Sequence, residues 1–302
     1  MPATGVYAAT MEPDLADLRK TIIAHDPALR ATRFRLHTMG FDSVAVDVDG
    51  RLIFKFPRHA EAERRLRTEA GILAILRPSI TMPLPDLTLH DGPPLFSKHT
   101  KLQGEHLLAA HYETLPAVAR ERLAADIALF FCELHALDPI AMKNAGAGPI
   151  GAWLPPEEIL RQTWPLLPED LHGYAERTID AWQDLPADPH GTTYGHFDSH
   201  GWNMAFDHAS GRLNGIYDFG DSGFGELHKE FIQPNWISPE LTRRVARKYE
   251  TLTGRMIDLP RVTLISGVLR LSELGGFADD PVRADEMVRT IADWAAYHEA
   301  AS

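Results

Sequence analysis

Three polar side chains in the second half of the chain have the types and the spacing that phosphoryl transfer needs. Asp198 precedes Asn203 by five positions, and Asp218 opens the run Asp218-Phe219-Gly220. Mg²⁺ binds oxygen ligands, so the amide of Asn203 and the carboxylate of Asp218 suit it. A further carboxylate must orient an acceptor hydroxyl and accept its proton, and Asp198 fits that task. The order of the three residues is the order typical of kinases.

The expected local structure brings these side chains together. Short strands are predicted near 193–196, 203–206 and 213–217. Asp198 and Asn203 then lie on a polar loop between the first two strands. The third strand ends at Asp218. Because a turn joins the second and third strands, we expect Asn203 and Asp218 to lie close together.

A lysine and a glutamate in the first third of the chain could handle phosphates. The predicted strand that follows the Asp49-Gly50 turn places Lys55 on the face opposite its larger apolar residues. Glu69 lies within the apolar face of a helix predicted over 59–76. A carboxylate in such a place is costly unless it is paired. We therefore predict a Lys55–Glu69 ion pair that aims the ammonium group at the nucleotide phosphates.

The turn Met39-Gly40-Phe41-Asp42-Ser43 is expected between two strands. Its backbone N–H groups and the Ser43 hydroxyl could lie over the same phosphates. With one glycine only, this turn is a weak signal by itself.

The overall pattern indicates two regions. A helix over 13–25, several strands and the 59–76 helix form the first, which we assign as a nucleotide-binding lobe over 1–103. The second, over 104–302, is mainly helical and is expected to hold the catalytic and substrate-binding groups. The segment from Pro139 to Pro156 is rich in glycine and proline and is predicted to be a loop.

Composition excludes several classes of protein. The 302 residues carry a net charge of −12, which disfavours non-specific nucleic-acid binding. The only cysteine, Cys132, allows no intrachain disulfide, which suits a reducing cytoplasm. No stretch is long and apolar enough for a membrane helix, and the first residues do not read as a signal peptide. We expect a cytoplasmic monomer or dimer that contacts neither nucleic acid nor membrane.

The chain resembles the aminoglycoside phosphotransferase family, which belongs to the protein-kinase-like superfamily together with choline kinases. Its pattern is most similar to the 2''-phosphotransferase branch. The resemblance runs from about Phe34 to the C-terminal helices. It is closest in four segments: Gly40-Phe41-Asp42-Ser43, Leu66-Arg67-Thr68-Glu69-Ala70, Lys101-Leu102-Gln103-Gly104 and Asp218-Phe219-Gly220-Asp221-Ser222-Gly223.

The resemblance implies a bilobal α/β (α+β) fold of the protein-kinase type, with an N-terminal antiparallel sheet lobe and a mainly helical C-terminal lobe. It implies Asp198 as the catalytic base and Asn203 and Asp218 as Mg²⁺ ligands. It also implies that Lys55 holds phosphates, with Glu69 as its partner.

By the same resemblance, the segment from His99 to Leu102 is the hinge whose backbone groups read adenine, and Thr100 and Leu102 are the candidates. The donor is ATP, with GTP left open. The partner is a small-molecule hydroxyl acceptor. An aminoglycoside is the first choice, and choline-like, sugar-like and macrolide acceptors stay open.

Two other readings remain. His196, Asp198 and His200 have metal-ligand side chains at close spacing, so a metal-dependent hydrolase is conceivable. That reading leaves Lys55, Glu69, Asn203 and Asp218 unexplained. A nucleotide-binding protein without transferase activity is the other alternative.

Overall fold

The computed structural model describes residues 14–38 and 42–299. Residues 39–41 of the glycine-containing turn predicted over 39–43 lie outside these residues, and the structure describes its last two members, Asp42 and Ser43. Within the described part of the chain, no helix has the length and apolarity to cross a membrane.

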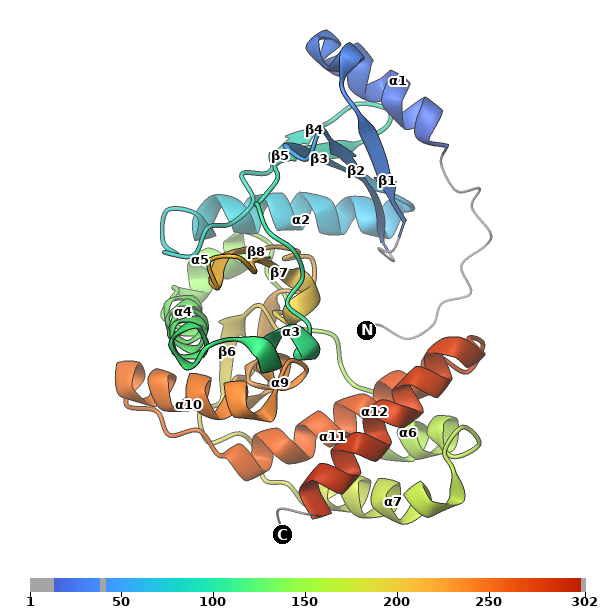
Figure 1. The fold of residues 1–302 in the computed structure, drawn as a ribbon, viewed down its shortest axis with the longest axis vertical. Helices are drawn as coiled ribbons and strands as arrows, with labels where there is room; N and C mark the ends of the chain where they lie inside the picture. Colours follow the sequence, from blue (N-terminus) through green and yellow to red (C-terminus); the bar gives the residue numbers. More distant parts are fainter. Residues whose placement is uncertain (1–13, 39–41, 300–302) are drawn as a thin grey trace.

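A five-stranded antiparallel sheet forms the first region, in the order β1-β2-β3-β5-β4 (Figure 1). Its strands are β1 (Phe34–His37), β2 (Ser43–Val48), β3 (Leu52–Pro57), β4 (Thr88–His90) and β5 (Phe96–Thr100). The predicted Asp49-Gly50 turn is present, since both residues have positive φ angles, of 55° and 67°. Such angles match the right-handed twist of a tight hairpin.

Two helices cover the two faces of this sheet (Figure 1). Helix α1 (Leu15–His25) begins after Asp14, whose side chain accepts the Ala16 N–H. It packs its buried residues on the face that carries the alternate side chains of β2 and β3, including Phe54. Helix α2 (Ala60–Leu76) lies on the other face, where Lys55 projects. Alternation along β3 therefore decides that Lys55 meets α2 and not the core under α1.

The second region is mainly helical (Figure 1). Its helices are α3 (Ala109–Thr114), α4 (Ala117–His135), α5 (Pro139–Asn144), α6 (Pro156–Thr163), α7 (Glu169–Gln183), α8 (Leu227–Glu230), α9 (Ile232–Asn235), α10 (Pro239–Thr253), α11 (Leu259–Gly275) and α12 (Pro281–Glu299). One apolar core lies around α4 and α10, and a second joins α6, α7, α11 and α12.

The prediction of a loop throughout 139–156 was wrong at its start. Helix α5 occupies Pro139–Asn144, with proline in its first turn and Asp138 as its N-cap. The Asp138 side chain accepts the N–H of Ile140 at 3.0 Å. Six residues are too few to show helical periodicity. Pro139 was therefore interpreted as a helix breaker, although it occupies the first turn of α5.

Two small antiparallel pairs lie among these helices. The strands β7 (Met204–Asp207) and β8 (Arg212–Ile216) form a hairpin, as predicted. The predicted strand near 193–196 is β6 (Thr192–Gly195), and it pairs with β9 (Gly223–Glu226). The strand β9 was not predicted, because its sequence Gly-Phe-Gly-Glu has little strand propensity.

Candidate active site

The loop between β6 and β7 holds Asp198 and Asn203 against each other. A short 3₁₀ turn over Gly201–Asn203 ends the loop. The side-chain nitrogen of Asn203 donates to Asp198 Oδ2 at 2.7 Å and to the Asp198 carbonyl at 2.8 Å. Since the nitrogen is directed at Asp198, the amide oxygen is the atom that Asn203 can offer to a cation.

The start of this loop has an unusual backbone that neighbouring side chains stabilise. Phe197 has a φ of 57°, a left-handed conformation that is costly for a residue with a side chain. The Phe197 N–H donates to Glu230 Oε1 at 3.1 Å, and Gln233 Nε2 donates to the Phe197 carbonyl at 2.6 Å. Both groups are buried. They bind the N–H and the carbonyl group of Phe197 and so fix the backbone from which the Asp198 side chain projects.

His196 braces the same loop from within the core. It is fully buried, its Nδ1 accepts the Asp198 N–H at 3.2 Å, and its Nε2 lies 3.2 Å from the Tyr217 carbonyl. Both ring nitrogens are therefore engaged with backbone groups.

The β7–β8 hairpin brings Asp218 to this loop, as the sequence predicted. The Tyr217 N–H donates to the Asn203 carbonyl at 3.0 Å, so Asp218 follows directly after a residue bonded to Asn203. Asp218 itself has a φ of 66°, another left-handed non-glycine residue. Strain of this kind concentrates at functional sites, where the surrounding structure fixes it.

Lys55 reaches the same place from β3. Its ammonium nitrogen lies 3.2 Å from Glu69 Oε2 and 2.9 Å from Asp218 Oδ1. Glu69 is buried, and its Oε1 accepts the Phe219 N–H at 3.1 Å. The predicted Lys55–Glu69 ion pair is thus present, and it also joins the sheet and α2 to the Asp218-Phe219 segment.

The charges of this cluster shift one another. Burial lowers the pKa of Lys55, but the carboxylates of Asp218 and Glu69 outweigh that effect and raise it overall. The positive charge of Lys55 in turn lowers the pKa of Asp218. The Lys55 ammonium is therefore charged at neutral pH, and so is the half-exposed Asp218 carboxylate.

The predicted hinge residues lie at the end of β5, where Thr100 is the last residue of the strand, and just after it, where Leu102 follows. Thr100 donates its N–H to Asp86 Oδ1 at 2.7 Å and its hydroxyl to Asp86 Oδ2 at 3.1 Å. The half-buried Leu102 lies against Gly215 of β8. An adenine contact by the Thr100 N–H would require Asp86 to give way, so the roles of Thr100 and Leu102 stay predictions.

A comparison with family profiles assigns the chain. The profile described as "Phosphotransferase enzyme family" matches residues 33–262, which is more than half of the chain. The chain belongs to this phosphotransferase family. Among curated protein sequences, none gives a significant match.

Solved structures of phosphotransferases share this fold. The GDP complex of wild-type aminoglycoside 2'-phosphotransferase-IIIa has a TM-score of 0.81 and 22% identity, over 95% of this chain and 100% of that one. The streptomycin–ATP complex of APH(2")-IIa has a TM-score of 0.62 and 17% identity, over 94% and 99%. The macrolide 2'-phosphotransferase MphH from Brachybacterium faecium has a TM-score of 0.66 and 16% identity, over 91% and 98%. The expected kinase-like fold, with a sheet followed by a mainly helical region, is confirmed.

The metal-hydrolase reading does not fit this phosphotransferase. His196 uses both ring nitrogens within the core, while His200 lies on the partly exposed side of the loop, with Nε2 at 3.2 Å from Asp198 Oδ1. In residues 14–38 and 42–299, no three histidine, cysteine, aspartate or glutamate side chains are placed to hold a metal ion together. The three residues therefore do not converge on one ion.

Several site groups were missed by sequence reasoning. Glu230 and Gln233 clamp Phe197 from α8 and α9, more than thirty residues away. Arg65 of α2 lies 2.9 Å from Asp42 and 3.5 Å from Asp221, so it links the first strands to the segment after Asp218. One spacing signal existed for Arg65, because it precedes Glu69 by one helical turn.

Glu273 of α11 was also missed, although its carboxyl group interacts with the charges of His200 and Asp198 in the catalytic loop. Burial raises its pKa to about 7, against the opposing charges of His200 and Arg270. Asp198 raises it further. Glu273 lies near the end of the long helix α11, and its position in the sequence alone does not show which groups it faces.

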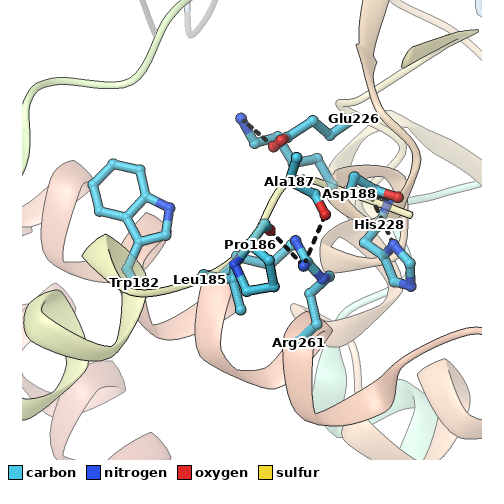
Figure 2. Close-up of a pocket in the computed structure, with 10 residues that line it drawn as sticks. Trp182, Leu185, Pro186, Ala187, Asp188, Glu226, His228 and Arg261 are labelled. Atoms are coloured by element: carbon cyan, nitrogen blue, oxygen red, sulfur yellow. Dashed lines mark hydrogen bonds and ion pairs between the residues drawn. The ribbon is translucent and has the colours of Figure 1, made fainter. Parts of the chain in front are cut away.

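A small cavity of about 70 Å³ lies away from these residues, between the end of α7, α8 and the start of α11 (Figure 2). Arg261 donates there to the carbonyls of Pro186 and Ala187, at 2.6 and 3.3 Å. Beside it, Asp188 and His228 form a buried pair with 2.7 Å between Oδ2 and Nδ1. The polar groups drawn in Figure 2 mainly bind one another, which indicates a structural network.

Proposed function

We propose that this phosphotransferase transfers the γ-phosphoryl group of Mg-ATP to a hydroxyl group of a small acceptor. The convergence of two groups of residues supports the proposal. The β7–β8 hairpin joins Asn203 to Asp218, and Lys55 reaches Asp218 from the sheet. The nucleotide would lie between residues 1–103 and 104–302, with Ser43 near the phosphates.

Each side chain then has one task. Asp198 orients the acceptor hydroxyl and accepts its proton while the new oxygen–phosphorus bond forms and ADP leaves. Lys55 donates to the α/β-phosphates, and Glu69 keeps it in place. Positioning and charge are the main requirements of this reaction, and the geometry of these residues suits both.

The donor set fits a magnesium ion. Asn203 directs its amide nitrogen at Asp198 and so has its oxygen for a cation, and Asp218 presents a half-exposed carboxylate. These are the hard oxygen ligands that Mg²⁺ prefers, in a site that leaves room for phosphate oxygens and water. When bound, Mg²⁺ would offset negative charge on the phosphates.

We propose an aminoglycoside as the acceptor. Burial and the negative charge of Asp198 raise the pKa of both Asp221 and Glu273, so carboxyl groups gather around the catalytic loop and favour a polycationic acceptor. The similar structures include one with streptomycin and ATP and one of a macrolide phosphotransferase. A macrolide, a sugar-like or a choline-like alcohol is the competing outcome.

ATP is our proposed donor, with GTP as the alternative, because similar structures contain either ATP or GDP. Thr100 and Leu102 are the proposed base contacts. We further propose a cytoplasmic location, in keeping with the single Cys132, and a monomer or dimer.

A nucleotide-consumption screen tests the function. The purified protein is incubated with Mg-ATP or Mg-GTP and a panel of aminoglycosides, macrolides, sugars and choline-like alcohols, and products are identified by mass spectrometry. We expect a phosphorylated aminoglycoside. Nucleotide binding without transfer to any acceptor would instead support a non-catalytic binding protein.

The variant Asp198→Asn tests the catalytic role. Loss of the proton acceptor is expected to lower turnover by ~10²- to 10⁴-fold, the usual contribution of a positioned acid/base. Nucleotide affinity should stay within about twofold of the wild type, because Asp198 contacts no phosphate in this mechanism. Unchanged turnover would remove Asp198 from the mechanism.

A further inference from the structure

His200 connects the proposed catalytic base to the turn that carries the proposed metal ligand. Its Nδ1 accepts the Trp202 N–H at 3.2 Å and so caps the 3₁₀ turn over Gly201–Asn203. Its Nε2 lies 3.2 Å from Asp198 Oδ1. One imidazole ring therefore has a partner on each side, and both partners belong to the catalytic loop.

The cap on the turn decides which ring nitrogen of His200 carries the hydrogen. A neutral imidazole has one donor and one acceptor nitrogen. Because Nδ1 accepts the Trp202 N–H, the hydrogen is on Nε2, where it points at Asp198. The contact with Asp198 is thus a hydrogen bond whose direction is set by the backbone of the turn.

The carboxylate of Asp198 is consequently held at both oxygens. His200 donates to Oδ1, and Asn203 donates to Oδ2 at 2.7 Å. Two donors on different oxygens fix the plane of the carboxylate, and each oxygen keeps a further lone pair for an acceptor hydroxyl. A base held in this way meets the acceptor in one orientation, which is what an effective intramolecular proton transfer needs.

We propose that His200 is a positioning residue of the phosphotransferase: it aligns Asp198 through Nε2 and the Asn203 turn through Nδ1. This inference rests on the proposed function. The turn is also held from a neighbouring segment, since the Leu107 N–H donates to the Gly201 carbonyl at 3.0 Å. His200 and the Asn203 side chain together link this turn to Asp198.

Two amide substitutions separate the two contacts. In His200→Asn the side-chain oxygen replaces Nδ1 and retains the cap on Trp202, but it is too short to reach Asp198. In His200→Gln the amide nitrogen replaces Nε2 and retains the bond to Asp198, but the cap is lost. His200→Ala removes both contacts.

The kinetic test uses an acceptor phosphorylated by the wild type. For His200→Asn we expect a kcat lowered by about 10- to 100-fold, with the nucleotide KM within about twofold, because Asp198 loses its alignment and the turn does not. His200→Gln should recover most of kcat and instead raise the KM for Mg-nucleotide. Wild-type kcat in His200→Asn and His200→Ala, or equal loss of kcat in the Asn and Gln variants with retained Tm, would overturn the proposal.

A second measurement does not depend on turnover. Burial lowers the pKa of His200, but Asp198 outweighs that effect and raises it overall, so the measurement is made at a pH high enough for the ring to be neutral. In ¹⁵N-histidine-labelled protein at this pH, the nitrogen shifts of His200 should show the hydrogen on Nε2, and Asp198→Ala should shift the Nε2–H resonance. A ring protonated at Nδ1 would overturn the inference even if the kinase assignment stands. If the wild type transfers phosphate to no acceptor, the proposed function fails, and this measurement still decides whether the hydrogen bonds of His200 exist.

Discussion

The carboxyl group of Glu273 gives the sharpest prediction, because its ionisation and the charge of the catalytic loop affect each other. Burial raises its pKa from 4.5 to about 7, although His200 and Arg270 oppose the shift. In the unfolded chain the group loses its proton near pH 4.5. Between these two values the folded protein keeps a proton that the unfolded chain has released, so the stability that this group contributes is lost as the pH rises towards 7.

The size of the effect follows from the shift. A difference of about 2.5 pKa units at about 1.4 kcal/mol per unit corresponds to roughly 3 kcal/mol. Glu273 is only partly buried, so water reduces the cost, and we expect about 2 kcal/mol. Glu273→Gln has nearly the same size and cannot ionise. The variant should therefore match the wild type at pH 4 and be about 2 kcal/mol more stable at pH 8.

Urea denaturation at half-unit pH steps from 4 to 8 measures this difference. The exposed Glu286 of α12 provides the control, since Glu286→Gln should leave a curve parallel to the wild type. Parallel curves for Glu273→Gln and wild type would refute the raised pKa, and so would a variant that is less stable at pH 8. A cationic acceptor should lower the pKa of Glu273 on binding, so its binding should release a proton in the wild type and not in Glu273→Gln.

Three further substitutions test the geometry of the site. Glu69→Gln weakens the anchor of Lys55 and should raise the nucleotide KM by roughly tenfold, because a charge-assisted contact is lost; an unchanged KM in steady-state kinetics would contradict the anchoring role. Asp218→Ala should abolish the Mg²⁺-dependent part of nucleotide affinity in titration calorimetry, and an Mg²⁺ dependence equal to that of the wild type would contradict its assignment. Gly201→Ala places a Cβ 1.8 Å from the Leu107 carbonyl oxygen and should lower the free energy of unfolding by at least ~3 kcal/mol. In the control Gly148→Ala the new Cβ meets no atom within 4 Å, so Tm should stay nearly unchanged.

The sequence predicted which side chains of the proposed phosphate site lie together, because the chemistry of phosphoryl transfer leaves few choices. Asp198, Asn203 and Asp218 lie close together in the chain, and one predicted hairpin was enough to bring them together. Lys55 and Glu69 are further apart, but strand alternation and the cost of an unpaired buried carboxylate pointed to their pairing. Local sequence patterns were therefore enough to predict which residues meet at the proposed nucleotide-binding site.

The groups that support this site could not be predicted in the same way. Glu230 and Gln233 act on a single peptide more than thirty residues away, and nothing in their own helices marks them. The bond from Thr100 to Asp86 depends on how a proline-rich loop returns to the sheet. Glu273 has a raised pKa because the packing of α11 buries its carboxyl group. These contacts depend on the tertiary structure, so they cannot be predicted from the periodicity of apolar residues in the sequence.

The contacts around Lys55 indicate how the donor site is prepared for its ligands. Lys55 binds both Glu69 and Asp218, and Glu69 also accepts the Phe219 N–H. In the proposed mechanism Asp218 would hold a metal ion and Lys55 would donate to a phosphate, so the 2.9 Å bond between these two residues would be replaced on binding. The bonds of Glu69 can persist through this exchange, because neither ligand needs its buried carboxylate. Glu69 then holds α2 to the Asp218 segment before and after binding, and the donor side keeps its geometry while Lys55 and Asp218 change partners.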